Sequence, residues 1–385
     1  MVQNHALVLG ASGISGWSLL NQLRSYPSAD SWKRITGTTN RSFSLEQARI
    51  PAEDRIKIVS GIDLVGPVNQ IVRDFREKVP DIDTVTHVFF TAYIQKDSFQ
   101  QLKETNTLLL QNSVKAIETL SPNLQVIILQ TGGKGYGLEF PKEVQISPPL
   151  REDMPRIPKP WYDNIFYYTQ YDTLKEMAKG KQWTFSEIRP DGIVGFVPGS
   201  NAMNMAQGIA IYLSLCRRVY GERAHIPFPG YEHGYHSTHS DTFQDLLAKM
   251  EIYASLNPDR CGDGGVFNIA DKDEPDTWAE VWPGICKYFG LQGVPPQKES
   301  KGMQEFVQEH MGEWQELCTS QGLDRKAVES QNWGHVHFML VEFDFDRQYD
   351  LSRAREIGFT ESIDTVQGYQ IAFDRMAAAK IIPKF

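Results

Sequence analysis

The chain has few cysteines and no long apolar run, and both absences narrow its class. Its 385 residues contain four cysteines, none in a CxxC pair, so we expect buried free thiols rather than disulfides or a zinc site. No window approaches the roughly 18 uninterrupted apolar residues of a membrane-spanning helix. The opening Met-Val-Gln-Asn-His lacks the basic stretch of a secretory signal peptide. We therefore expect a cytoplasmic protein that does not associate with a membrane.

A basic surface and a hydrolase motif are also missing. Lys and Arg number 39 against 48 Asp and Glu, which gives a net charge of −9 without any Lys/Arg-rich run. Nucleic-acid-binding proteins present basic patches, so we expect no nucleic acid as a partner. No GxSxG segment occurs, so the sequence does not indicate a Ser-His-Asp hydrolase.

Histidines are the residues here that most invite a metal interpretation. His233, His236 and His239 recur every three residues, but an intervening glycine makes the single helix that would align them unfavourable. Ser240-Asp241 is typical of the N-cap of a following helix. His335-Val-His337 alternates as strand residues do, which favours a structural role. We therefore predict that the protein binds no metal.

The N-terminal half alternates strand and helix patterns. We predict strands at 6–9, 34–38, 85–91, 125–129 and 184–189, and helices at 16–26, 67–77, 101–119 and 163–179. This alternation predicts an α/β fold, a doubly wound parallel sheet of the Rossmann type with helices on both faces. Irregular segments rich in Gly, Pro and aromatic residues follow, so we expect a smaller, mostly helical C-terminal portion.

Three glycines follow the first predicted strand. Gly10, Gly13 and Gly16 come directly after the apolar run Ala6-Leu-Val-Leu9 and open a helical pattern. A dinucleotide pyrophosphate needs a tight turn, a backbone without Cβ atoms and a helix N-terminus, and this segment supplies all three. The GxxGxxG spacing is typical of extended and atypical short-chain dehydrogenases. The alternative is an ordinary tight strand-to-helix turn.

The end of the second predicted strand indicates which dinucleotide is bound. NAD-binding folds usually place Asp or Glu there, but this chain has Gly37-Thr-Thr-Asn-Arg-Ser42. Arg41 offers a planar fork for a 2′-phosphate and no carboxylate repels it, which favours NADPH. A surface arginine beside a turn is the alternative. Asp63 fits a position that contacts adenine, although an Asp that caps a turn would look the same.

Further segments carry a family resemblance along the chain. They are Gln130-Thr-Gly-Gly-Lys134, Asn164-Ile-Phe-Tyr-Tyr168, Arg189-Pro-Asp-Gly-Ile-Val-Gly-Phe196, Gly265-Val-Phe-Asn-Ile-Ala270 and Lys380-Ile-Ile-Pro383. With the glycines, they resemble the progesterone 5β-reductase/iridoid synthase-like family of atypical short-chain dehydrogenases/reductases, in a fungal-type branch. The resemblance implies that Lys134 and Tyr167 are the catalytic pair and that the Lys134 cation favours an acidic tyrosine.

This sequence departs from the family pattern at three places. Gly135 stands where a histidine usually follows the lysine, Ile165 is inserted after the asparagine, and Thr91-Ala-Tyr93 replaces a Thr-Trp pair. These departures bear on the identity of the substrate more than on cofactor binding.

A second tyrosine competes for the catalytic role. Tyr171 and Lys175 satisfy the YxxxK signature of ordinary dehydrogenases. The distance to Pro190 is 23 residues from Tyr167 and 19 from Tyr171, and the longer separation is closer to the family's. We therefore favour Tyr167, while Tyr171 with Lys175 stays open.

Together these features predict an NADPH-dependent reductase of an activated C=C bond or a ketone in a small, apolar, carbonyl-containing metabolite. Residues 1–195 would form the NADP-binding domain and residues 196–385 the substrate-binding portion, with some segments returning to the sheet. A redox-neutral isomerase, epimerase or cyclase, a non-catalytic NADP-binding regulator and a homodimeric assembly stay open. The predicted cofactor-binding residues are Gly10, Ser12, Gly13, Ile14, Gly16, Thr39, Asn40, Arg41, Asp63, Thr91, Tyr167 and Ile193.

Overall fold

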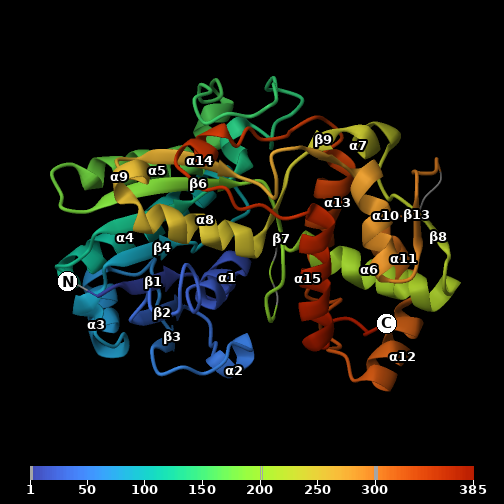
Figure 1. Cartoon of the computed structure of the whole chain (residues 1–385), viewed down its shortest axis with the longest axis horizontal. Coiled ribbons are helices and arrows are strands. Elements are labelled where there is room, and N and C mark those ends of the chain that lie inside the picture. Colours follow the sequence, from blue (N-terminus) through green and yellow to red (C-terminus); the bar gives the residue numbers. More distant parts are fainter. Residues whose placement is uncertain (1–2, 200, 202, 299–301) are drawn as a thin grey trace.

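A seven-stranded parallel sheet forms the centre of the N-terminal part (Figure 1). The computed structural model describes residues 3–199, 201, 203–298 and 302–385. The strand order is β11-β6-β5-β4-β1-β2-β3, and it reverses between β1 and β4, where doubly wound folds bind their ligands. The strands are β1 (His5–Leu9), β2 (Arg34–Thr39), β3 (Ile56–Ser60), β4 (His87–Phe90), β5 (Val126–Gln130), β6 (Thr184–Pro190) and β11 (Gly265–Ile269).

Helices bury both faces of this sheet because successive strand side chains point to opposite sides. Ala6 and Val8 of β1 pack in one apolar cluster with α1 and α8, whereas Leu7 and Leu9 pack in another with α3, α4 and α5. The predicted α/β, doubly wound fold is therefore confirmed. The helices are α1 (Ile14–Gln22), α3 (Val68–Lys78), α4 (Phe99–Leu120), α5 (Phe166–Ala178) and α8 (Gln244–Leu256).

The chain leaves the seven-stranded sheet after β6, continues through β7 (Gly192–Val194), which lies outside that sheet, and builds a second, mainly helical part at the right of Figure 1. Its longer helices are α6 (Met205–Tyr220), α10 (Trp278–Tyr288), α12 (Met311–Gln321) and α15 (Thr365–Ala378). Its shorter helices are α7 (Glu232–His236), α11 (Met303–Glu309), α13 (Trp333–His337) and the π-helical turn η4 (Phe338–Glu342). The predicted boundary at residue 195 falls directly after β7.

The remaining elements are short. They are α2 (Leu45–Ala48), α9 (Pro258–Cys261), α14 (Ser352–Glu356), the 3₁₀ turns η1 (Ile82–Thr84), η2 (Gly133–Tyr136) and η3 (Trp161–Asn164), and the strands β8 (His225–Pro227), β9 (Thr238–His239), β10 (Asp241–Phe243), β12 (Asp276–Thr277) and β13 (Gln292–Val294).

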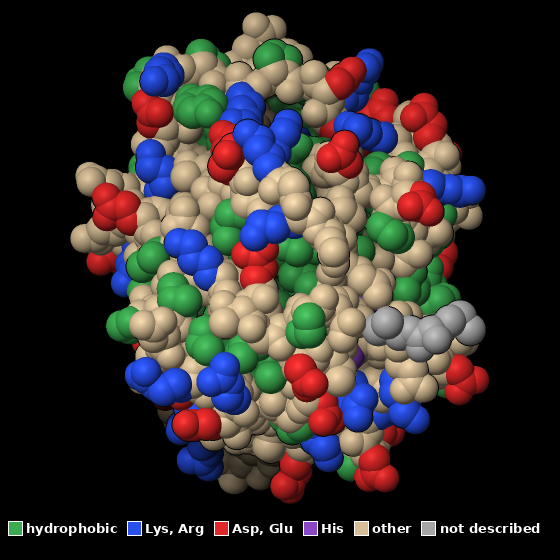
Figure 2. Space-filling model, turned by 90° about the vertical axis from the view of Figure 1, so that its left-hand side faces the viewer, with side chains coloured by type: hydrophobic (Ala, Val, Ile, Leu, Met, Phe, Trp, Pro, Cys, Tyr) green, Lys and Arg blue, Asp and Glu red, His purple; other side chains and the backbone are tan. Residues whose placement is uncertain are grey.

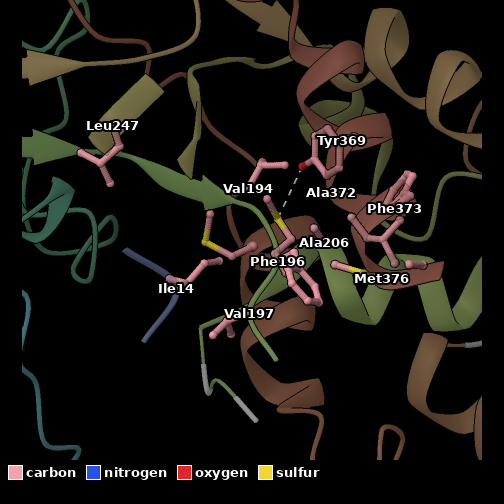
Figure 3. Close-up of a cluster of buried hydrophobic side chains, with 14 of the residues drawn as sticks. Ile14, Val194, Phe196, Val197, Ala206, Leu247, Tyr369, Ala372, Phe373 and Met376 are labelled. Carbon is pink, nitrogen blue, oxygen red and sulfur yellow. Dashed lines mark hydrogen bonds between the residues drawn. The ribbon is translucent and has the colours of Figure 1, made fainter. Parts of the chain in front are cut away.

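One apolar core runs between the two parts. Figure 3 shows Ile14 of α1 and Val194 of β7 in the same cluster as Ala206 of α6 and Tyr369 of α15. Segments distant in sequence also return to the sheet: β11 pairs with β6, and the Ser18 hydroxyl of α1 donates a hydrogen bond to the Gln244 carbonyl at 3.0 Å. The second part thus shares one apolar core with α1, which follows the carboxyl end of β1.

Two further findings concern the charge on the surface and the composition of the helices. Lys and Arg are interspersed with Asp and Glu over the face shown in Figure 2. Among the residues that the structure describes, none of the helices has both the length and the apolar composition needed to cross a bilayer.

The structure corrects several sequence-based assignments. Strand β3 was missed because Lys57 interrupts its short apolar pattern, and β3 lies at the edge of the sheet, where an exposed residue costs little. Helix α8 begins at Gln244 rather than after a Ser240-Asp241 cap, because Asp241 pairs with β7 in β10 and accepts a 3.0 Å hydrogen bond from Tyr369.

The secondary structure predicted for the two histidine segments was also wrong. Residues 232–236 form helix α7 despite the glycine at its centre, while His239 lies on β9. His335 and His337 lie on helix α13, which Asn332 caps by accepting a 3.2 Å hydrogen bond from the His335 backbone N–H. In the described residues no group of three or more His, Cys, Asp or Glu side chains is placed to hold a metal ion.

Because two histidines are buried in the sheet, we expect acid to destabilise the fold. His5 is buried, and its ring nitrogens lie 2.9 Å from the hydroxyls of Thr84 and Thr36. Burial, and then the charge of Arg34, lowers the pKa of His5 to about 4, and burial also lowers the pKa of His87 to about 4. Since the folded pKa lies below the unfolded one, each neutral histidine contributes stability above pH 6.5 that is lost as the pH falls toward 4.

We expect the free energy of unfolding to fall by about 3 kcal/mol per histidine across that window. Urea unfolding of the wild type and of His5→Gln at several pH values between 7 and 4 measures this dependence. His5→Gln retains hydrogen-bonding capacity without titrating, so its stability should fall less steeply with pH, and His5→Gln/His87→Gln less steeply still. An unchanged slope in His5→Gln would contradict the assignment.

Candidate active site

A large cavity of about 980 Å³ opens at the carboxyl ends of the paired strands β1 and β4. Both parts of the chain line it. The sequence-predicted residues that line it are Gly10, Ser12, Gly13, Ile14, Thr39, Asn40, Arg41, Asp63, Thr91, Lys134, Tyr167 and Ile193. Gly16 is the one predicted residue outside the lining. The structure thus brings the nucleotide motif and the predicted Lys-Tyr pair to one cavity.

The structure explains the three glycines after β1 in different ways. Gly10 has a φ of +92°, and a Cβ there would lie 2.8 Å from the backbone nitrogen of Ala92 on the neighbouring loop. A Cβ on Gly16 would lie 2.2 Å from the Gly10 carbonyl oxygen. Around Gly13, in contrast, only the Gly10 carbonyl oxygen comes near, at 3.3 Å, and the residue faces the cavity. Gly10 and Gly16 therefore shape the turn, whereas Gly13 leaves room for a ligand.

Helix α1 begins at this opening without a side-chain cap. Its N-cap residue is Gly13, which supplies no side-chain acceptor for the first-turn N–H groups. Free N–H groups and the helix dipole favour an anion at this position. The glycine turn, the uncapped helix and the space in front of Gly13 fit the pyrophosphate of a dinucleotide.

The end of β2 lies beside this helix and carries the residues predicted to select the cofactor. The hydroxyls of Ser12 and Thr39 lie 3.0 Å apart. Arg41 is exposed at the cavity edge and has no ion pair or hydrogen bond within the described part of the chain. Asp63 accepts a 3.0 Å hydrogen bond from the Val65 backbone N–H, as a turn-capping Asp does, and still lines the cavity.

Replacing Arg41 with alanine is expected to weaken NADPH binding selectively. Loss of a charge-assisted hydrogen bond to the 2′-phosphate, about 1.5–3 kcal/mol, should raise the dissociation constant for NADPH by roughly ten- to two-hundredfold and leave that for NADH nearly unchanged. Titration calorimetry with both cofactors measures this. Arg73→Ala, at an exposed arginine of α3, is the matched control. Equal losses for NADPH and NADH would rule out the selection.

The predicted lysine lies on the η2 turn that follows β5. Two tyrosines fix this turn: the Tyr168 hydroxyl donates to the Gly135 carbonyl at 2.5 Å, and the Tyr136 hydroxyl donates to the Asn268 side chain at 2.6 Å. The Lys134 ammonium forms a 2.5 Å ion pair with Glu139, which also lines the cavity. The positive charge of Lys134 is thus balanced within the cavity wall.

The predicted tyrosine lies in the first turn of helix α5. The Tyr167 ring packs against Phe166 with 4.4 Å between centroids, and its hydroxyl has no hydrogen-bond partner among the described residues. Burial raises the pKa of Tyr167 above its usual range, and Tyr93 and Glu139 raise it further. The expectation that Lys134 makes this tyrosine acidic is therefore wrong for the protein alone, because Glu139 balances the lysine and burial disfavours a phenolate. A phenol that keeps its proton remains a hydrogen-bond donor.

The competing pair lies elsewhere. The Tyr171 hydroxyl donates a 2.7 Å hydrogen bond to the Gly264 carbonyl beside the amino end of β11, and Lys175 lies over the Tyr171 ring. Neither residue lines the cavity. One helical turn therefore separates a tyrosine whose hydroxyl is free for a ligand from one that is engaged with the backbone.

Several cavity residues were not predicted from the sequence. Glu139 lies on the loop after η2, and His335 with the apolar side chains Phe338, Met339 and Phe343 comes from α13 and the following turn. His335 had been interpreted as structural, and neither segment carries a motif. The i+5 spacing from Lys134 to Glu139 was the one available signal for the ion pair.

Comparisons with known proteins agree with this geometry. Residues 6–383 match the PRISE-like Rossmann-fold domain family. The chain is 36% identical to "Short chain dehydrogenase ausT" of Aspergillus calidoustus, over 98% of this chain and 94% of that protein. It is 28% identical to the 3-oxo-Delta(4,5)-steroid 5-beta-reductase of Arabidopsis thaliana, over 98% and 93%.

The fold is also shared with solved structures of distant sequence. The UDP-glucose 4-epimerase of Thermus thermophilus in complex with NAD is 15% identical, with a TM-score of 0.59 over 97% of this chain and 99% of that one. At this identity the likeness concerns the fold alone. The family match over nearly the whole chain and the fungal relative show that this protein belongs to the PRISE-like family of Rossmann-fold short-chain dehydrogenases/reductases.

Proposed function

We propose that the protein is an NADPH-dependent reductase of a carbonyl-conjugated C=C bond or a ketone in a small, neutral, apolar metabolite. The observation that carries this proposal is the shared cavity: the unengaged Tyr167 hydroxyl, Lys134 and the glycine cradle at the start of α1 all face it. The steroid 5-beta-reductase relative supports a reduction, and the cofactor-edge Arg41 supports NADPH.

The cavity residues would bind and position the two reactants. The first turn of α1 would hold the pyrophosphate, Arg41 the 2′-phosphate, and Ile193 of β7 would lie along the apolar wall of the same cavity. When bound, NADPH supplies a hydride to the substrate. Phe166, next to Tyr167, and Leu138 also line the cavity and would exclude water from the reacting groups.

Tyr167 would stabilise the charge that develops on the substrate oxygen. Its proton is retained in the resting site because burial raises its pKa, so the hydroxyl donates a hydrogen bond to the carbonyl oxygen. That bond strengthens as the oxygen becomes an enolate or alkoxide, which is how a donor lowers the barrier rather than merely binding substrate. Lys134, which is paired with Glu139, would place its ammonium near the same oxygen and the cofactor.

A rate assay with a chemically graded panel tests this function. NADPH oxidation is followed with cyclic enones, including steroid Δ4-3-ones, with acyclic enals and with saturated ketones, and the product mass is determined. With NADPH deuterated at C4, deuterium at the β-carbon identifies C=C reduction and deuterium at the carbinol carbon identifies ketone reduction. Product formation without net NADPH oxidation would instead indicate a redox-neutral isomerase, epimerase or cyclase. Tight NADPH binding without any product would favour a regulator.

A further inference from the structure

Helix α13 and the π-helical turn η4 form one wall of the cavity. Phe338, Met339 and Phe343 line the cavity from this segment. π-helical turns are rare and often occur at functional sites, because the wider turn changes the direction of the side chains that follow. Within the described part of this segment, His335 is the one ionisable side chain that lines the cavity. The wall is therefore mostly apolar, and its polar side chains are the His335 imidazole and Asn332, the N-cap of α13.

The hydrogen bonding of His335 defines what it can offer to a ligand. Burial, and then the charge of Lys134, lowers the pKa of His335 to about 4, so the ring is neutral at pH 7. A neutral imidazole has one N–H donor and one acceptor nitrogen. The backbone of Met203 opposes this lowering of the pKa, as a carbonyl that faces one ring N–H does. Within the described residues neither ring nitrogen lies in a side-chain or backbone hydrogen bond, so with the N–H directed toward Met203 the other nitrogen is left to accept from a ligand in the cavity.

The charges around this imidazole indicate the kind of group that it would meet. Lys134 is already paired with Glu139 at 2.5 Å, so less of its charge is left for a carboxylate or phosphate of a ligand. An unpaired acceptor in a partly buried wall gains most from a ligand donor, because leaving it without one costs free energy when water is displaced. A hydroxyl supplies such a donor without adding charge.

We propose that His335 is a specificity-determining residue whose free ring nitrogen accepts a hydrogen bond from a hydroxyl of a neutral substrate whose hydrocarbon surface lies against Phe338, Met339 and Phe343. The inference rests on the proposed function in one respect, since the reactive carbonyl of the same substrate would lie at Tyr167. It adds that the substrate carries a second oxygen, as a hydroxyl donor, away from the reacting carbonyl.

A series of hydroxychalcones tests this inference, because chalcone is a neutral, apolar enone and a hydroxyl can be moved around both rings. Binding to the NADP⁺-loaded enzyme is measured by titration calorimetry and reduction by NADPH oxidation, for chalcone and each monohydroxy isomer. The quantity compared is the ratio of affinities, hydroxylated to unsubstituted, within each variant. A general weakening of the site by mutation cancels in this ratio.

We expect at least one isomer to bind the wild type about three- to tenfold more tightly than chalcone, as for one neutral hydrogen bond. His335→Phe should abolish that preference and His335→Gln, which keeps an amide acceptor, should restore part of it. His337→Phe is the matched control, because His337 is exposed two residues further along and its ring nitrogen lies 3.7 Å from Glu342. That variant should retain the preference.

Three results would overturn the inference: no isomer preferred over chalcone, a preference that survives His335→Phe, or no binding by any member of the series. The proposed function fails separately. If hydroxychalcones bind with the expected His335 dependence but no chalcone is reduced, the hydroxyl site stands and the enone reductase assignment is wrong. If chalcones are reduced without hydroxyl preference, the reductase assignment stands and the role of His335 is wrong.

Discussion

Replacing Tyr167 with phenylalanine is expected to reduce kcat by about two to three orders of magnitude while NADPH binding stays intact. The substitution keeps the ring that packs against Phe166 and removes only the hydroxyl, which has no other partner in the described part of the protein. Loss of one preorganised donor to a developing oxyanion costs about 10²- to 10³-fold in kcat. Steady-state kinetics on a substrate found in the panel, with calorimetry for NADPH, measures both quantities.

Tyr171→Phe is the matched control for this variant. It removes a hydroxyl from the same helix one turn later, where the partner is the Gly264 carbonyl rather than a ligand. We expect a small loss of stability, about 1 kcal/mol for one hydrogen bond, and nearly unchanged kcat. Reversed results, with Lys175→Ala more harmful than Lys134→Ala, would identify an ordinary YxxxK dehydrogenase. If neither tyrosine mattered, stabilisation by a phenol would have to be abandoned.

Glu139 affects the electrostatics of both Lys134 and Tyr167. The carboxylate pairs with Lys134 and is also among the causes that raise the pKa of Tyr167. In this arrangement the tyrosine acts as a donor that keeps its proton, rather than as a phenolate prepared by the lysine. The two residues that the resemblance implied line one cavity, but the local charge balance depends on a glutamate that no motif marks.

The parts of the fold that the sequence predicted are those in which local pattern and tertiary environment agree. Strand β1 is buried along its whole length and is apolar from Ala6 to Leu9. In the glycine motif at its end, close backbone contacts leave no room for a Cβ at Gly10 or Gly16. Strand β3 is an edge strand with an exposed Lys57, so its signal was too weak. Asp241 resembles a helix cap in sequence but is committed to a strand by long-range contacts with β7 and Tyr369.

The two sides of the candidate site also differ in how well the sequence predicted them. Its cofactor side is built from consecutive residues around the ends of β1 and β2, where the spacing of glycines and the absence of an acidic residue could be read directly. Its substrate side is assembled from segments about 200 residues apart, the η2 loop and α13, and their proximity follows from packing rather than from any local pattern. His335 therefore looked structural in the sequence and faces the cavity in the fold.

Gly13→Val separates the two kinds of glycine in the nucleotide motif. A Cβ added at Gly13 meets only the Gly10 carbonyl oxygen, at 3.3 Å, and the backbone there is extended, so we expect the valine variant to fold. The branched side chain would instead occupy the space before the first turn of α1 and displace a pyrophosphate from two or three N–H groups. At about 1.5–3 kcal/mol for each charged hydrogen bond, we expect at least a hundredfold rise in the dissociation constant of NADPH.

Circular dichroism, thermal unfolding and calorimetry distinguish this outcome from simple misfolding. Gly312→Val, at an exposed helical glycine with no atom within 4 Å of the added Cβ, is the control for inserting valine and should bind NADPH normally. Gly16→Val should fail to fold, because its Cβ would lie 2.2 Å from the Gly10 carbonyl oxygen. Undiminished NADPH affinity in a folded Gly13→Val protein would show that the phosphate binds elsewhere, and the cofactor side of the cavity would have to be reassigned.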